Sequence, residues 1–298
     1  MGDDGRGETV SAIGTWDVKH VLGEADVAPD GSCTFECPAN NAVYFQLLDS
    51  LGRCVQTMRS WTMVAPGEES ACVGCHEDKM QVYPADKGIA SSKVQRLHPA
   101  AGQPPHPLLA RLDKENMLAS ATNYLGVDAP RSSDPNAPTE GFSFVQRIQP
   151  ILSAHCVKCH DGTEKCKWRP DLTAAWDPSF KDGSARKYSK AYRSLTSGGA
   201  QTARLNWYSN VGRSEMLPPC AQGSTQSKIM EHFEPAHHGV KVSDAEKRLF
   251  ACWIDLAIPF AGSYAEQTVW TAEDRNIFEY HQSKRAVFAE EEIRAIKK

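Results

Sequence analysis

The sequence predicts an α+β fold in which a β-rich N-terminal part precedes a helical C-terminal part. Residues 8–65 contain "VYFQLLD" and "CVQTMRSWTMV", which are rich in β-branched and aromatic residues and flank the turn sequence "SLGR". From residue 141 onward, apolar residues recur instead at the spacing of a helix. We therefore expect a small β-sandwich at 8–65 and a mainly helical domain at 141–264.

The intervening residues 66–140 are expected to be rich in loops. Prolines recur in "HPAAGQPPHPLL" and in "VDAPRSSDPNAPTEG", and they suppress regular structure. This segment is expected to end in a linker near 128–140. Because it offers few residues for a core of its own, a covalently bound cofactor would help to hold it.

Two helices are expected to bracket the 141–264 domain. The first runs along "FSFVQRIQPILSAHCVKCH" and places four apolar side chains on one face: Phe144, Ile148, Ile151 and Leu152. The second begins with Ser243 and Glu246 at the spacing of a capping box and stops at Pro259. Its apolar stripe comprises Leu249, Phe250, Trp253 and Ile254. Residues 265–298 are expected to form a charged helical tail, capped at Thr271 or Asp274, with a thin apolar stripe.

Composition and charge exclude several classes of function. The net charge of −4 provides no basic surface for nucleic acid, and no apolar run is long enough to span a membrane. Ten cysteines are unusual for a reducing compartment, although the N-terminus lacks the pattern of a secretory signal. We therefore expect a mature form or fragment of a protein exported to the periplasm or a similar compartment, with Cys37 and Cys54 as the favoured disulfide.

The pattern CxxCH occurs twice, at residues 72–76 and 156–160. It is the attachment signal for c-type haem, in which two thiols bind the porphyrin edge and the following imidazole binds the iron. Random placement of the cysteines and histidines would give two matches with a probability of only about 10⁻⁴. The sequence thus predicts two covalent haems, attached through Cys72, Cys75 and His76 and through Cys156, Cys159 and His160.

Zinc is the main chemical alternative, because CxxC pairs with histidines can build a tetrahedral site. Zinc does not require a histidine directly after the second cysteine, whereas haem attachment does, and both motifs have one. Zinc is therefore kept only as a weaker, additional candidate. A thioredoxin-like redox role is disfavoured because neither motif lies in a βαβ pattern.

The second iron needs a ligand on its opposite face, and three residues are candidates. His237 and His238 lie in "EPAHHGV", and Met216 lies in "SEMLPPC". We favour His237, because Met216 is equally explained as a packing residue. For the first iron, His98 and His106 both precede prolines, and neither is favoured.

Two long stretches resemble the alpha subunit of hydrazine synthase and its relatives. The first comprises "DGSCTFECPANNAVYFQLLD" and "VQTMRSWTMVAPGEESACVGCHE", and the second comprises "FVQRIQPILSAHCVKCHDG" and "HHGVKVSDAEKRLFACWIDLAIPFAGSY". The resemblance implies a two-haem subunit with a cytochrome c-like second domain, and His237 as the distal ligand of the second iron. It also implies an upstream β-propeller, which these 298 residues do not contain, and a tyrosine at the position of Met80, near which Tyr83 is the first tyrosine.

The expected function is that of a dihaem c-type cytochrome that exchanges electrons with a redox partner protein. The resemblance adds a second hypothesis, an oxidoreductase subunit that acts on small nitrogen compounds at the first haem and belongs to a larger complex. High-spin iron at the first haem would favour the enzyme. Two six-coordinate irons would favour electron transfer alone.

Overall fold

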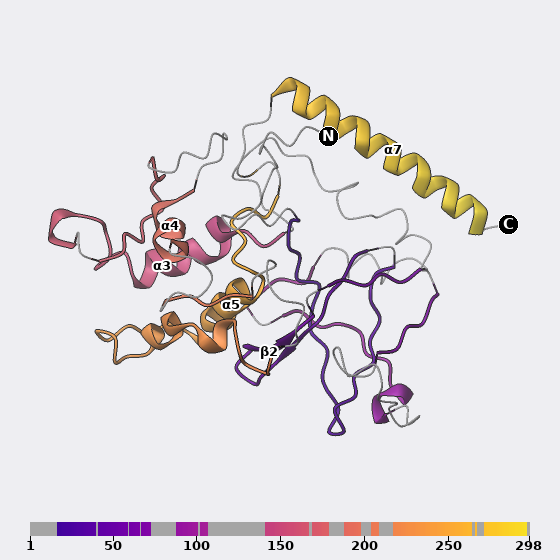
Figure 1. Ribbon diagram of the computed structural model, residues 1–298, viewed down its shortest axis with the longest axis horizontal. Helices are drawn as coiled ribbons and strands as arrows, with labels where there is room; N and C mark the ends of the chain where they lie inside the picture. Colours follow the sequence, from indigo (N-terminus) through magenta and orange to yellow (C-terminus); the bar gives the residue numbers. More distant parts are fainter. Residues whose placement is uncertain are drawn as a thin grey trace. The chain divides into compact units, whose positions relative to one another are not determined.

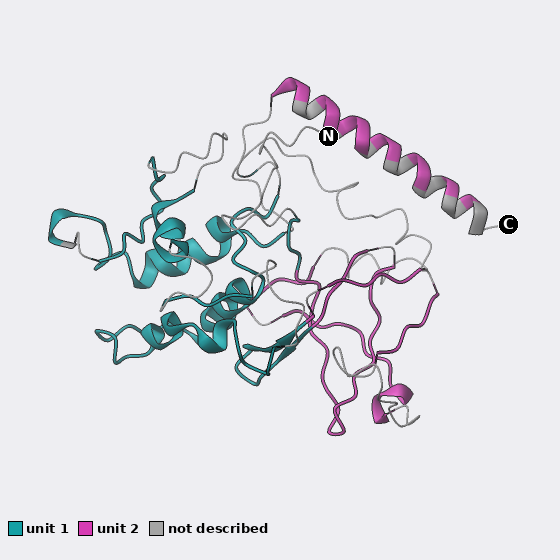
Figure 2. Cartoon of the chain, viewed as in Figure 1, with its two compact units in different colours: residues 1–20, 46–57, 132–269 teal, residues 21–45, 58–131, 270–298 magenta. Residues whose placement is uncertain are grey.

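The structure is a computed structural model in which the chain divides into two compact units (Figures 1 and 2). Unit 1 comprises residues 1–20, 46–57 and 132–269, and unit 2 comprises residues 21–45, 58–131 and 270–298. The structure describes residues 17–39, 41–58, 60–65, 67–72, 88–100, 102–106, 141–166, 169–178, 188–197, 204–208, 217–263, 266 and 271–296. These residues confirm a mixed α and β structure. Each unit combines separated segments, whereas the predicted domains run contiguously along the chain.

A two-stranded antiparallel sheet lies in unit 1. Strand β1 (Gln46–Leu48) pairs with β2 (Cys54–Thr57), with a register shift between its last two residues. The predicted turn joins them: the Asp49 carboxylate accepts the backbone N–H of Arg53 at 2.9 Å and forms an ion pair with its guanidinium. Gly52 has a φ of 75°, which glycine adopts without strain. The hairpin is therefore specified by local residues, as expected.

The described residues do not form the predicted sandwich of two sheets. Outside β1 and β2, the N-terminal segments of unit 2 pair only through isolated bridges, for example between Val43 and Thr62. Turns interrupt these segments, as at Asp30, whose carboxylate accepts the backbone N–H groups of Ser32 and Ile89. Because the chain turns after a few residues, extended ladders do not develop.

The two helices predicted for the C-terminal domain are present in unit 1. A π-helical turn η2 (Phe144–Ile148) continues into α3 (Gln149–His155), and the four apolar residues predicted on one face are buried. Helix α5 (Asp244–Asp255) begins with the predicted capping box. It ends before Pro259, because Ala257 and Ile258 have left-handed φ angles of 63° and 49°. Helical periodicity and capping residues thus located both helices.

Aromatic side chains form the core between these helices. Phe144 of η2 packs against Tyr192, Trp253 and Phe260, with ring centroids 5.1–6.0 Å apart. The Tyr192 hydroxyl donates to the carbonyl of Ile258 at 2.7 Å. Burial of these large rings contributes most of the apolar stabilisation that holds the start of η2–α3 in place.

Six further elements complete the described chain. Unit 1 also contains η3 (Glu164–Cys166), α4 (Lys190–Thr196), η4 (Ser224–Gln226) and η5 (Lys228–Phe233), and unit 2 contains η1 (Ile89–Ser92) and α7 (Ala272–Ile296). Helix α7 confirms the predicted tail helix, and Ile277 and Val287 of its expected stripe are exposed. None of the described helices combines the length and apolar character needed to cross a bilayer.

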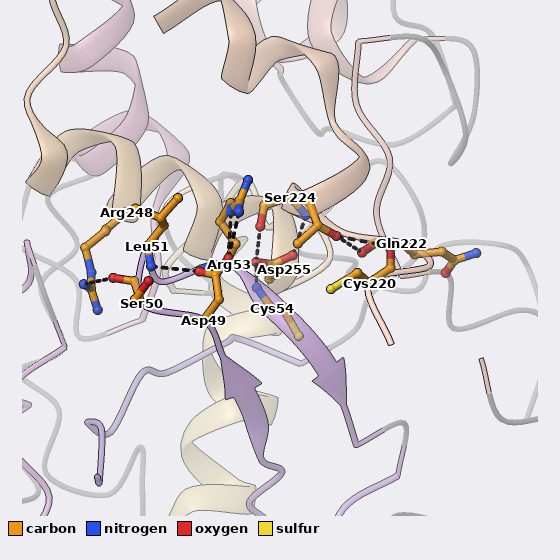
Figure 3. A network of polar contacts seen from close by, with 11 residues as sticks. Asp49, Ser50, Leu51, Arg53, Cys54, Cys220, Gln222, Ser224, Arg248 and Asp255 are labelled. Atoms are coloured by element: carbon orange, nitrogen blue, oxygen red, sulfur yellow. Dashed lines mark hydrogen bonds and ion pairs between the residues drawn. The ribbon is translucent and has the colours of Figure 1, made fainter. Parts of the chain in front are cut away.

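A buried carboxylate joins the sheet to α5 (Figure 3). Asp255 accepts the backbone N–H of Cys54 on β2 at 3.0 Å, and it accepts both the N–H and the hydroxyl of Ser224 on η4 at 2.7 Å. The carbonyl of Asp255 also accepts from the Gln46 side chain at 2.7 Å. Burial raises the pKa of the Asp255 carboxyl to about 6, although these donors oppose the shift.

We expect Asp255→Asn to remove one component of the pH dependence of stability. In the unfolded chain the Asp255 carboxyl has its usual pKa of 3.8 and is largely ionised between pH 4 and 6. In the folded chain the same carboxyl retains its proton until about pH 6. The folded state is therefore favoured below this window, and its advantage is lost as the pH rises through it. The unfolding free energy of the wild type minus that of the variant should fall by about 2–3 kcal/mol over this range.

Urea unfolding at several pH values would measure this difference, with Asp30→Asn as a control of opposite sign. The backbone N–H of Ile89, followed by Ser32, lowers the pKa of the Asp30 carboxyl. The difference between wild type and Asp30→Asn should therefore rise with pH. A flat difference for Asp255→Asn would contradict the role assigned to its buried carboxyl.

Candidate functional site

The second CxxCH motif forms a compact turn at the end of α3. Cys156 is the residue that caps the helix, and its backbone N–H donates to the carbonyl of Leu152. The carbonyl of Cys156 in turn accepts the N–H groups of Cys159 at 3.0 Å and His160 at 3.1 Å. The Cys156 side chain is half-buried and that of Cys159 is exposed. The motif residues therefore lie on one turn of chain that follows directly from a packed helix.

The imidazole of His160 is oriented by a backbone carbonyl. Its Nδ1 lies 3.1 Å from the carbonyl oxygen of Pro170, which can only accept a hydrogen bond. The proton therefore belongs on Nδ1, and Nε2 is left with a free lone pair. Two hydrogen bonds hold the segment around Pro170 against the motif. The N–H of Leu172 donates to the carbonyl of His160, and the Arg169 side chain donates to the carbonyl of Cys159.

The ring of His237 lies near that of His160. Their ring centroids are 6.4 Å apart and their planes differ by 28°. With metal–nitrogen bonds of about 2.0 Å and ~1.2 Å from each nitrogen to its ring centre, two imidazoles on opposite sides of one metal would have centroids ~6.4 Å apart. The observed separation fits that arrangement.

The donor set favours a group that brings its own equatorial ligands. Within the described ranges, no group of three or more His, Cys, Asp or Glu side chains is placed to hold a metal ion. Two imidazoles alone do not complete the tetrahedral site that structural zinc requires. As a donor set they would fit an iron porphyrin, whose ring supplies the other four nitrogens.

Electrostatics keep both imidazoles available as ligands. Burial lowers the pKa of His160, against the opposing effect of the Pro170 carbonyl, and Arg169 lowers it further. Burial also lowers the pKa of His237, followed by the nearby His232 and His238. Both rings are therefore neutral near pH 7, and only a neutral imidazole can bind a metal.

Two further histidines surround His237. The ring of His232 lies 4.6 Å from that of His237, and the ring of His238 lies 5.1 Å from it. His238, the second candidate ligand, is exposed and has a left-handed φ of 54°. Met216, the third candidate, lies outside the described residues. Of the three, His237 is the one whose ring the structure places near that of His160.

Helix α5 helps to position the motif. His155, which directly precedes Cys156, has its Nε2 3.1 Å from the Glu246 carboxylate. The same carboxylate forms the capping box with Ser243. One acidic side chain therefore both caps α5 and ties it to the end of α3.

The residues predicted around the first haem are largely outside the described part of the chain. Cys72 is described and exposed, whereas Cys75, His76, Met80 and Tyr83 are not described. His98 is exposed, with its Nε2 3.8 Å from the Asp26 carboxylate. His106 is buried. The attachment of the first haem stays a prediction.

Sequence reasoning missed the roles of Arg169 and Pro170. Pro170, whose carbonyl contacts the His160 ring, lies ten residues after that histidine in the sequence. The run "WRPDL" offered a weak signal, because a proline can present its carbonyl while lacking a backbone donor. The aromatic residues Trp207, Trp253 and Tyr188 are fully buried, whereas Trp61 and Trp176 are exposed.

The fold and site define an α+β chain in which a CxxCH turn faces a second histidine. Comparisons with known proteins relate this chain to one family. Residues 1–77 match the model for the hydrazine synthase alpha subunit middle domain, a segment that includes the first CxxCH motif. The hydrazine synthase subunit alpha of Kuenenia stuttgartiensis is 26% identical over 196 residues. These matches confirm the resemblance to the hydrazine synthase alpha family.

The extent of the matches is limited. The aligned region covers 59% of this chain and 23% of the subunit, so the chain spans about a quarter of that relative. The solved structure of Kuenenia stuttgartiensis hydrazine synthase matches with a TM-score of 0.46 and 16% identity, over 87% of this chain and 36% of the other.

The two thiols of the second motif should differ in reactivity in the haem-free chain. Burial raises the pKa of the Cys156 thiol to about 11, so roughly one molecule in 1,000 carries the thiolate at pH 8. We expect iodoacetamide to modify the exposed Cys159 at least about 10-fold faster. Peptide mass spectrometry over a time course would measure both rates. In urea the two thiols should be modified at equal rates. Equal modification rates in the folded chain would contradict the burial of Cys156.

Proposed function

We propose that this chain is a dihaem c-type cytochrome that transfers electrons through two covalently bound haems. The observation that carries the proposal is the second motif, where His160 is oriented by the Pro170 carbonyl and lies 6.4 Å from His237 between ring centroids. Similarity to the hydrazine synthase alpha subunit supports a redox role. The two CxxCH sequences supply the attachment residues.

Four residues would hold the second haem. Cys156 and Cys159 would bind its edge covalently, and His160 and His237 would be the protein ligands of its iron. The Pro170 carbonyl keeps the proton on Nδ1 of His160, which directs Nε2 toward the metal. The haem, when bound, supplies reversible one-electron transfer. With both protein ligands of the iron supplied by side chains, the site would suit electron transfer rather than substrate binding.

The first haem would be held by Cys72, Cys75 and His76. The family match at residues 1–77 covers this motif. This observation favours a second candidate function, that of a hydrazine synthase-like redox subunit that acts on small nitrogen compounds at the first haem. Such a subunit would need one open axial position there, in contrast to the second site.

The proposal also implies a compartment and partners. Covalent haem attachment and ten cysteines suit an exported, oxidising location such as the periplasm. The net charge of −4, together with acidic haem propionates, suits a redox partner with a basic face. The relative is a subunit by name, so a larger assembly is proposed here as well.

The proposal is tested by expression with a signal peptide in a host that matures c-type cytochromes. Intact mass and pyridine haemochrome spectra should show two covalent haems per chain, and one after replacement of Cys156 and Cys159 by serine. A chain that carries zinc and no covalent haem would contradict the proposal.

We expect His237→Ala to change the ligation of one haem without releasing it. Both thioether bonds should remain, so the haem count stays at two, while the absorption spectrum gains a high-spin component in one of the haems. His238→Ala is the matched control, because its exposed ring adjoins that of His237. The control should retain the wild-type spectrum. An unchanged spectrum in His237→Ala would assign the distal ligand to another residue, with Met216 tested next.

The second candidate function has its own test. Nitric oxide or hydroxylamine added to the two-haem protein should alter the spectrum of the first haem if that iron has an open position. The Cys156→Ser, Cys159→Ser variant, which retains only the first haem, isolates this response. If both haems are low-spin and neither compound changes their absorption spectra, electron transfer is left as the proposed function.

A further inference from the structure

Two cysteines beside the Asp255 carboxyl have no part in the proposed haem sites. Cys54 is the first residue of β2, has 0% of its surface exposed, and donates its backbone N–H to Asp255. Cys220 lies in the turn before η4 and is half-buried. Figure 3 shows both residues next to the same carboxyl.

Backbone contacts hold the Cys220 segment against β2. The N–H of Cys220 donates to the carbonyl of Val55 at 2.7 Å, and the side chain of Gln56 donates to the carbonyl of Leu217 at 3.3 Å. Cys220 is therefore hydrogen-bonded to the residue that directly follows Cys54, which places the two cysteine-bearing segments side by side.

The Cys220 backbone is fixed by further bonds. Its carbonyl accepts from the Gln226 side chain at 2.8 Å, and its φ of 58° is left-handed, which is uncommon for a residue with a side chain. Ser224, four residues later, shares the Asp255 carboxyl with Cys54. One buried group thus anchors both cysteine-bearing segments.

The two sulfur atoms belong to one electrostatic cluster. Burial raises the pKa of the Cys54 thiol, and Asp255 and Cys220 raise it further. Burial likewise raises the pKa of the Tyr208 hydroxyl, followed by Cys54, Asp255 and Cys220. These effects agree with the backbone hydrogen bond between the Cys220 segment and β2.

We infer that Cys54 and Cys220 form a disulfide that fastens β2 to the turn before η4. The half-buried Cys220 thiolate would first attack a disulfide oxidant, such as oxidised glutathione or an exported oxidoreductase, and release one thiol of it. The Cys54 thiolate then attacks the Cys220 sulfur and releases the second thiol. Two protein thiols lose two electrons and two protons, and the oxidant's disulfide becomes two thiols.

The cross-link replaces the pairing of Cys37 with Cys54 that the sequence favoured. The thiols of Cys37, Cys54 and Cys220 are all free in the structure, and the Cys220 segment is hydrogen-bonded to β2. The Cys54–Cys220 bond would close a long loop that contains both CxxCH motifs. It does not depend on haem, and it leaves the four motif cysteines available for attachment.

Peptide mapping tests the pairing directly. The full chain, purified from an oxidising compartment or treated with oxidised glutathione, would be alkylated without reduction and digested. We expect a peptide pair joined through Cys54 and Cys220 that disappears after reduction with a phosphine. Alkylation of both residues without prior reduction, or linkage of Cys54 to another cysteine, would overturn the inference.

Thermal unfolding with and without the phosphine gives a second readout. Reduction should lower the melting temperature of the wild type by roughly 5–15 °C. Cys220→Ala, whose side chain is half-buried, should melt at the reduced temperature and no longer respond. Cys37→Ser is the matched control and should keep both the cross-link and the response. Loss of the response in Cys37→Ser, with its retention in Cys220→Ala, would establish the other pairing.

Discussion

The buried carboxylate of Asp255 is the interaction on which the arrangement of unit 1 depends. It lies at the last residue of α5 and satisfies donors on β2 and η4. A side chain at Gly223 would place its Cβ 2.4 Å from this carboxylate, so the approach requires glycine, which also has a φ of 86° there. The raised pKa shows that burial of the charge opposes folding. The three hydrogen bonds offset this cost, and their loss would leave an unpaired buried charge.

Helix α5 connects this network to the candidate haem site. At its C-terminal end, Asp255 holds the sheet, and at its N-terminal end, Glu246 contacts His155, the residue before the CxxCH turn. Between these ends, Trp253 packs on Phe144, which begins the η2–α3 helix. A two-histidine centre needs ligands held to within a fraction of an ångström. A short helix packed at both ends provides that rigidity, whereas a loop would not.

The accuracy of sequence reasoning followed the range of the interactions involved. The capping box at Ser243 and the turn at Asp49 depend on residues three or four apart, and both are confirmed. The sandwich at 8–65 required many strands to pair over long distances. Alternating apolar residues indicate an extended chain but not its partner, and the described residues show isolated bridges instead. The pairing of Cys37 with Cys54 stays a prediction, because spacing along the chain does not report which thiols meet.

The sequence by itself located the two CxxCH motifs, the two helices of the 141–264 region, and the resemblance to the hydrazine synthase alpha family. Each of these is encoded in contiguous residues. Only the tertiary structure decided which histidine faces His160, which carbonyl orients its ring, and which cysteine lies beside Cys54. These depend on backbone groups and on segments many residues apart in the sequence. Their proximity arises only when α5, the sheet and the aromatic core have packed together.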